Sequence, residues 1–137
     1  TLIVTSIVEK TAPFLLFGRY EILEIKNDEM VKDHKTGLIW QRLYETNMNW
    51  ETALKYSRNL CYGGFSDWRI PTLNELKTLI NENQDSTSDF PAIMNDDYFW
   101  SSSKAYGYSH SRFVISLSSG SARCILEKNE INIMCVR

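Results

Sequence analysis

Short apolar stretches separated by polar, turn-forming residues predict β-strands in the first third of the chain. Gly37 lies in one of these turns and suits a backbone of positive φ. A separate apolar stretch near the N-terminus, ended by Pro13, is a candidate extra strand. We expect strands at 20–25, 30–32 and 38–40, a further candidate at 2–8, and turns at 27–29 and 33–37.

The segment 50–60 has the periodicity of an amphipathic helix. Its apolar and small residues recur at spacings of three and four, which places them on one helical face. Asn49 is a suitable N-cap, and Gly63 with Gly64 is expected to stop the helix. The residues that share this face are Trp50, Ala53, Leu54, Ser57 and Leu60.

A T-x-x-E capping box at 72–75 predicts the start of a second helix. In this motif the side chains of Thr72 and Glu75 each satisfy a backbone N–H of the first turn, which has no partner inside the helix. We expect the helix to end near Asn83. Its apolar face comprises Leu73, Leu76, Leu79 and Ile80.

The last part of the chain returns to strand patterning after a long polar loop at 84–97. A loop of this length in a compact domain is usually functional or held by its own packing. Alternating apolar residues then predict three strands, at 112–117, 121–126 and 131–136. Strands, two helices, a loop and more strands, in that order, predict an α+β domain rather than alternating βαβ units.

The composition is that of an ordinary globular domain. The chain has 137 residues, of which 43% are hydrophobic and 12% aromatic, enough for a core without metal or disulfide support. A net charge of -2 argues against a dedicated nucleic-acid-binding protein. No apolar run approaches the roughly 18 residues of a membrane span. Residues 75–100 hold one basic and six acidic groups, whereas residues 101–137 hold five basic and two acidic groups.

Side chains suited to catalysis are few. The chain has two histidines, His34 in a predicted turn and His110 in a serine-rich loop. No nucleophile elbow, zinc-binding helix or phosphate-binding glycine loop occurs in the sequence. We therefore expect no enzymatic activity and assign no catalytic residue.

Oxygen-bearing side chains gather around the predicted loop and could offer ligands to Ca²⁺, although we expect no cofactor. Their spacing lacks the D-x-[DN]-x-[DN]-G pattern of a calcium loop. A solvated loop is therefore the interpretation that we favour. The residues concerned are Asn83, Asp85, Asp89, Asn95, Asp96 and Asp97.

The segment 104–123 mixes cationic and aromatic residues with Ser and Gly. This composition is typical of adaptable binding surfaces. Cationic groups beside aromatic rings suit an anionic glycan or an acidic protein partner, through charge-assisted hydrogen bonds and ring stacking. A solvated loop and sheet edge is the competing interpretation. The candidate ligand-binding residues are Lys104, Tyr106, Tyr108, His110, Arg112 and Arg123.

Other conspicuous residues are better explained by structure than by binding. Asp67 and Arg69 flank Trp68 directly before the capping box, where charge-assisted hydrogen bonds can lock the loop. Large aromatic side chains dominate burial in small domains, so we expect the tryptophans in the core. They are Trp40, Trp50, Trp68 and Trp100.

Five segments, in order, resemble one protein family. The longest is GGFSDWRIPTLNEL at 63–76, which matches a signature of the form GG-[YF]-x-DWRLPT-x-x-EL. The others are TGLIWQ at 36–41, WETALKY at 50–56, FWSSS at 99–103 and MCVR at 134–137. Together they resemble the Lcl C-terminal domain family, which is found at the end of a collagen-like bacterial adhesin and in many secreted or surface proteins.

The resemblance implies both a fold and a function. It implies a C-type-lectin-like fold, similar to that of formylglycine-generating enzymes, with two helices, a twisted antiparallel sheet and long loops over 20–137. Residues 1–19 would be an N-terminal extension or an extra strand. The implied function is non-catalytic ligand binding or adhesion outside the cytoplasm, in the periplasm, on the cell surface or after secretion. The alternative is a structural or protein-partner domain of a larger surface or periplasmic assembly.

The resemblance also bears on the three cysteines. Members of the family usually have a disulfide between the first helix and the C-terminal segment. Here this resemblance implies a Cys61–Cys135 disulfide with Cys124 free. Ser57 stands where many members carry the helical cysteine, and this puts the bond in doubt. A Cys124–Cys135 bond between neighbouring strands and three unpaired thiols are the alternatives.

Overall fold

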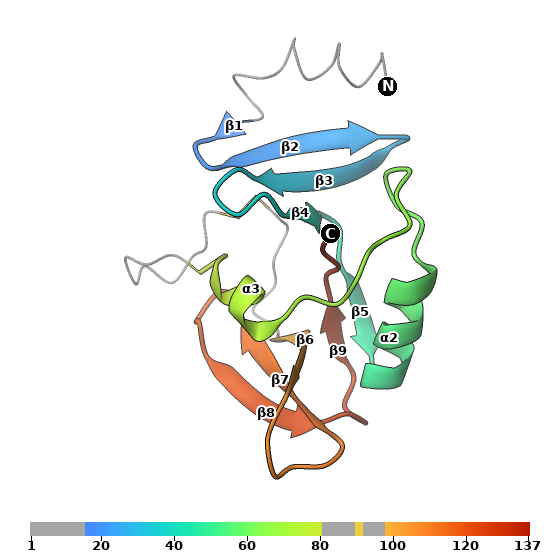
Figure 1. The fold of residues 1–137 in the computed structure, drawn as a ribbon, viewed down its shortest axis with the longest axis vertical. Helices are drawn as coiled ribbons and strands as arrows, with labels where there is room; N and C mark the ends of the chain where they lie inside the picture. The colour runs from blue at the N-terminus through green and yellow to red at the C-terminus, as the bar shows by residue number, and fades with distance from the viewer. Residues whose placement is uncertain (1–15, 81–89, 92–97) are drawn as a thin grey trace.

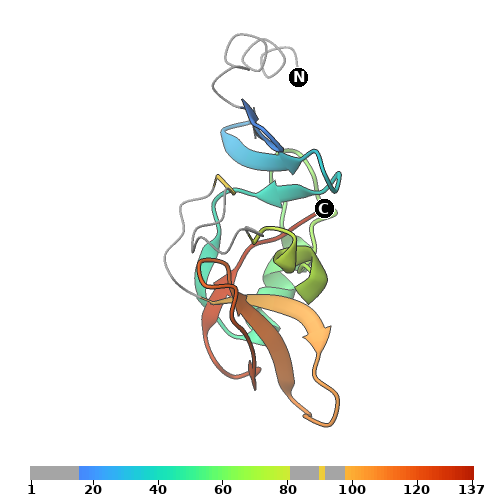
Figure 2. The same ribbon diagram turned by 90° about the vertical axis from the view of Figure 1, so that its left-hand side faces the viewer.

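The described part of the chain folds into two β-sheets, with two helices packed against the second sheet (Figure 1). The computed structural model describes residues 16–80, 90–91 and 98–137. The four-stranded sheet lies at one end, and strands β6 to β8 of the five-stranded sheet lie at the other (Figures 1 and 2). This arrangement confirms the predicted α+β class.

The four-stranded sheet is an antiparallel meander in sequence order. Lys26 and Asn27 both have positive φ, 53° and 66°, the backbone of a tight two-residue hairpin. The turn is therefore shorter than predicted, and its second strand starts at Asp28. Segment 2–8 lies outside the described residues. The strands are β1 (Leu16–Phe17), β2 (Tyr20–Ile25), β3 (Asp28–Asp33) and β4 (Ile39–Gln41).

The five-stranded sheet is mixed rather than antiparallel throughout. Its central strands β6 and β9 run parallel, whereas the other neighbours are antiparallel. Strand β5 was not predicted, because three of its four residues are polar and exposed and it has no apolar run. The order is β5 (Glu45–Met48), β9 (Ile131–Ile133), β6 (Tyr98–Lys104), β7 (Ser111–Ser116) and β8 (Ala122–Leu126).

Helix α2 (Trp50–Asn59) starts as the sequence predicts, with the Asn49 side chain accepting a hydrogen bond from the Thr52 N–H. It ends at Asn59, with Leu60 as its C-cap, before the two glycines. Gly63 instead turns the chain back at φ 60°, where its N–H donates to Asp28. A Cβ at Gly63 would lie 2.5 Å from the Met30 sulfur, so the glycine permits close packing on β3.

Helix α3 (Leu73–Lys77) has both hydrogen bonds of the predicted capping box. It is shorter than predicted, because its last turn tightens. The Thr78 hydroxyl donates to the Glu75 carbonyl, and the Leu79 N–H bonds back only three residues, to Leu76. Leu76 and Leu79 are nonetheless fully buried, as the periodicity indicated.

The core has two halves, one on each side of the five-stranded sheet. Residues that follow one another in β9 and the tail alternate between them: Ile133 and Cys135 pack beside α2, whereas Met134 and Val136 pack beside α3. The tail also pairs with β4 through backbone bonds, including a Trp40–Val136 bridge. The C-terminal segment therefore joins the two sheets (Figure 1).

Candidate functional site

The loop between β6 and β7 lies at the end of the described structure that is farthest from the four-stranded sheet (Figure 2). Gly107 and His110 have positive φ, 80° and 59°, which lets the chain reverse within the loop. The His110 carbonyl accepts the Glu127 N–H at 2.7 Å, so the turn after β8 braces the loop. Inside the loop, the Tyr108 N–H donates to the Ala105 carbonyl at 3.3 Å.

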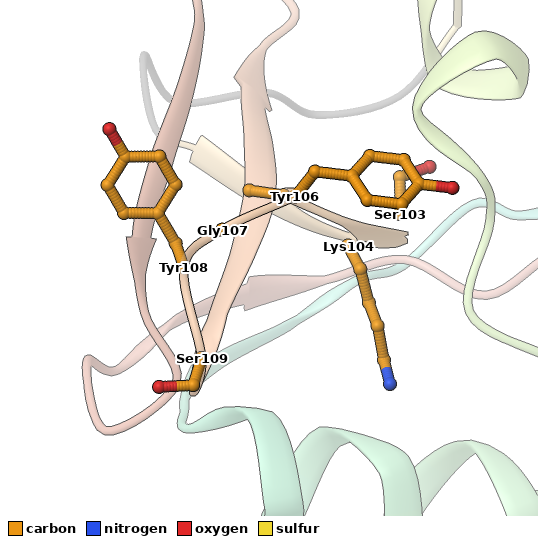
Figure 3. A pocket seen from close by; sticks show the side chains of 7 residues that line it. Ser103, Lys104, Tyr106, Gly107, Tyr108 and Ser109 are labelled. Carbon is orange, nitrogen blue, oxygen red and sulfur yellow. The ribbon is translucent and has the colours of Figure 1, made fainter.

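Two tyrosines project from this braced loop. Tyr106 is fully exposed and Tyr108 is 68% exposed, whereas Ala105 beside them is buried. Figure 3 shows the two rings pointing apart, with the Lys104 side chain extending in a third direction. Tyrosine combines an apolar ring with a polar hydroxyl, so two exposed tyrosines on one loop make a candidate contact surface. The open depression that they border is lined by residues 103–109.

Arg112 lies on β7, and its guanidinium is bonded within the sheet, whereas the depression is lined by residues 103–109. Its guanidinium bonds the Glu127 carboxylate at 2.9 Å and the Ser102 carbonyl at 2.9 Å. It also lies 4.2 Å from the centroid of the Trp50 ring. With its side chain only 15% exposed, Arg112 braces the sheet against α2.

Arg123 lies on β8, away from the loop. It pairs in register with Val114, two residues farther from the loop than Arg112, and its guanidinium lies 5.3 Å from the centroid of the Tyr98 ring. The structure thus brings Lys104, Tyr106 and Tyr108 together around one depression. His110 follows at the end of the loop, while the two arginines lie on the sheet.

The segment that leads into α3 is held in place by hydrogen bonds whose partners the sequence did not reveal. Asp67 pairs with Arg137, 2.6 Å from its Nε, and not with Arg69. Arg69 instead forms two bonds with Glu75, at 2.7 and 2.6 Å. The Trp68 indole N–H donates to the Tyr62 carbonyl at 3.0 Å.

All four tryptophans are buried. The rings of Trp50 and Trp100 meet edge to face, with centroids 5.8 Å apart. The Trp100 indole N–H donates to the Met48 carbonyl at 2.7 Å, while the buried Trp40 indole N–H finds no hydrogen-bond acceptor among the described residues. These rings fill the core, and Trp50 and Trp68 also line the groove described next.

A shallow groove between α2 and the segment 68–72 was not anticipated. Its floor is apolar, and Arg58 is exposed at its rim. No short motif signals it, because residues from three separate segments meet there. The lining residues are Trp50, Leu54, Ser57, Arg58, Trp68, Arg69, Ile70, Thr72 and Ser102.

The expected disulfides are absent, and all three cysteines are free. Cys135 is buried, where its N–H donates to the Gln41 side chain, whereas Cys61 and Cys124 are exposed. The Cys61–Cys135 expectation is corrected, because one thiol faces the core and the other faces solvent. Burial raises the pKa of the Cys135 thiol to about 12, so this thiol stays protonated near neutral pH.

The candidate calcium ligands at 83–97 fall outside the residues that the structure describes. Within 16–80, 90–91 and 98–137, no group of three or more His, Cys, Asp or Glu side chains is placed to hold a metal ion. In the same ranges, no helix has the length and apolar character needed to cross a membrane.

A family model, the Lcl C-terminal domain, matches residues 29–137. The chain belongs to this family. No curated protein matches it. The match includes helices α2 and α3, the five-stranded sheet and the loop between β6 and β7, called the tyrosine loop from here on, so these form part of the Lcl C-terminal domain. The family indicates a surface adhesin-related module.

Proposed function

We propose that this Lcl C-terminal domain is a non-catalytic, extracytoplasmic adhesion module whose loop 104–110 contacts an anionic glycan. The observation that carries the proposal is the full exposure of Tyr106 on a loop that the turn after β8 braces at His110. Bracing matters because a loop that is already ordered loses little entropy on binding. Family membership supports the adhesion role.

The chemistry of the loop suits a weakly bound anionic sugar. Tyrosine rings can stack on the apolar face of a sugar, and the exposed Lys104 ammonium can approach a sulfate or carboxylate. Because the groups are exposed, their attraction is screened beyond about 8 Å at physiological ionic strength. Binding should therefore weaken as salt rises.

Retention on a sulfated-polysaccharide column at low salt tests the proposal. We expect Tyr106→Ala with Tyr108→Ala, and separately Lys104→Ala, to elute earlier than the unmodified domain. Lys77→Ala is the matched control, because it removes an exposed cation on α3 and should leave elution nearly unchanged. If the unmodified domain passes through unretained, the anionic-glycan assignment is rejected.

A protein partner is the second candidate ligand. Exposed tyrosines beside Gly107 and Ser109 also match the composition of loops that bind proteins. In that case the domain would act as a structural or partner-binding unit of a larger surface assembly. Tyr106→Ala would then weaken capture of that partner while binding to the polysaccharide stays absent.

A further inference from the structure

Strand β8 is an edge strand of the five-stranded sheet, and within the described residues its outer side pairs with no other strand. We propose that this edge pairs with β8 of a second copy of the chain, antiparallel and centred on Cys124. An uncovered strand is a template for pairing, because its outward N–H and C=O groups lack partners. The proposal does not depend on the glycan assignment, since it concerns a different surface.

The hydrogen-bonding pattern shows which backbone groups face outward. The Glu127 N–H donates to the His110 carbonyl and the Ser116 N–H to the Ser121 carbonyl, so these are bonded pairs at the two ends of the β7–β8 ladder. Bonded and non-bonded pairs alternate in an antiparallel ladder. The residues whose N–H and C=O point away from β7 are therefore Ala122, Cys124 and Leu126.

The same three residues form an exposed apolar stripe. They alternate along the strand, so their side chains share one face, and Leu126 is 47% exposed. Of the outward groups, the Leu126 carbonyl is already used, by the N–H and side chain of Asn129. Among the described residues, β8 pairs only with β7.

The register centred on Cys124 is self-complementary. Ala122 lies opposite Leu126 of the second copy, a small side chain against a large one. Arg123 lies opposite Ile125 of the second copy, so like charges do not face each other across the strands. The Cys124 pair exchanges two hydrogen bonds, and each Leu126 N–H reaches an Ala122 carbonyl. Four bonds thus form without disturbing Asn129.

The opposite edge of the sheet is protected, which makes the open β8 edge notable. Strand β5 carries an irregular register between Glu45 and Met48, and Asn47 has a φ of 58°. An irregular register and a charged side chain such as that of Glu45 both hinder pairing of an edge strand with another chain. Strand β8 pairs with β7 over five residues without a shift. A five-residue contact is small, so we expect weak association that strengthens when domains are held close together.

Oxidative cross-linking tests the register directly. In a bonded antiparallel pair the Cα atoms are about 5.5 Å apart, within the roughly 4.4–6.8 Å that a disulfide needs. Diamide would then join the two Cys124 thiols, taking up their two electrons and two protons. We expect Cys61→Ser, which keeps Cys124, to give several-fold more covalent dimer than Cys124→Ser, which keeps the exposed Cys61.

A third variant and a second measurement complete the test. Leu126→Pro, made in the Cys61→Ser background, removes an outward N–H without breaking a bond to β7. It should reduce cross-linking to the level of the Cys124→Ser variant. Its melting temperature should equal that of the Cys61→Ser variant. Sedimentation equilibrium of the reduced, unmodified protein should show a monomer–dimer equilibrium. Equal cross-linking through Cys61 and Cys124, together with a monomer at all concentrations, would overturn the proposal.

Discussion

Arg69 forms a two-point ion pair with the carboxylate of Glu75, the residue that completes the capping box of α3. Glu75 Oε1 accepts both the Thr72 N–H, at 2.8 Å, and Arg69 Nη1, at 2.7 Å, while Oε2 accepts Arg69 Nη2 at 2.6 Å. The capping box is therefore tied to the preceding loop by an ion pair. The signature segment of the family acts here as a structural lock on the start of the helix.

Thr72→Ala should lower the free energy of unfolding by about 1 kcal/mol, because it removes the hydroxyl that accepts the Glu75 N–H. Chemical denaturation measures the change. Thr52→Ala is the matched control, since Thr52 lies in the first turn of α2 but is not its cap. A Thr72→Ala midpoint equal to that of the unmodified protein would show that the cap contributes nothing.

The Arg69–Glu75 pair should make stability depend on pH. The hydrogen bond from Arg69, aided by the Thr72 N–H, holds the pKa of Glu75 below its ordinary value of 4.5. A lowered folded-state pKa stabilises the protein above the ordinary value, and this contribution is lost as the pH falls through the folded-state value.

Glu75→Gln isolates this dependence. The gap in unfolding free energy between the unmodified protein and the variant should be greatest near pH 7 and should narrow below pH 4.5. Denaturation at a series of pH values measures it. A gap that stays constant into acid would contradict an ionised Glu75 as its source.

The native protein should show two reactive thiols, those of Cys61 and Cys124. Cys135 should react only after unfolding, because burial raises its pKa to about 12 and excludes the reagent. Thiol titration before and after adding denaturant counts them, and Cys124→Ser should lower the native count by one. A Cys135 that reacts as fast as Cys61 would be inconsistent with the buried position.

Arg112→Ala should destabilise the fold by about 2 kcal/mol, because it removes charged hydrogen bonds and a contact with Trp50. Arg123→Ala is its matched control on the neighbouring strand, with an expected change within about 0.5 kcal/mol. Thermal and chemical denaturation compare them. Equal effects would contradict the different roles that the structure assigns to the two arginines.

The sequence by itself determined the features that depend on neighbouring residues. The Asn49 cap, the apolar face of α2 and the capping box at Thr72 are each encoded within a few positions, and the structure contains them. The α+β order and most strands follow from local periodicity in the same way. The tyrosine loop was also visible, because Tyr, Ser and Gly lie together between two strands.

Tertiary structure alone decided which charged side chains are paired inside the protein and which thiols are exposed to solvent. Arg112 and Arg123 look equivalent in sequence, but among the described residues only Arg112 meets a carboxylate, that of Glu127, and the Trp50 ring. Asp67 finds its partner 70 residues away, at Arg137. Cys135 is buried because the tail crosses between the two sheets. These outcomes depend on which distant segments pack together, and packing of that kind leaves no signal in the spacing of residues along the chain.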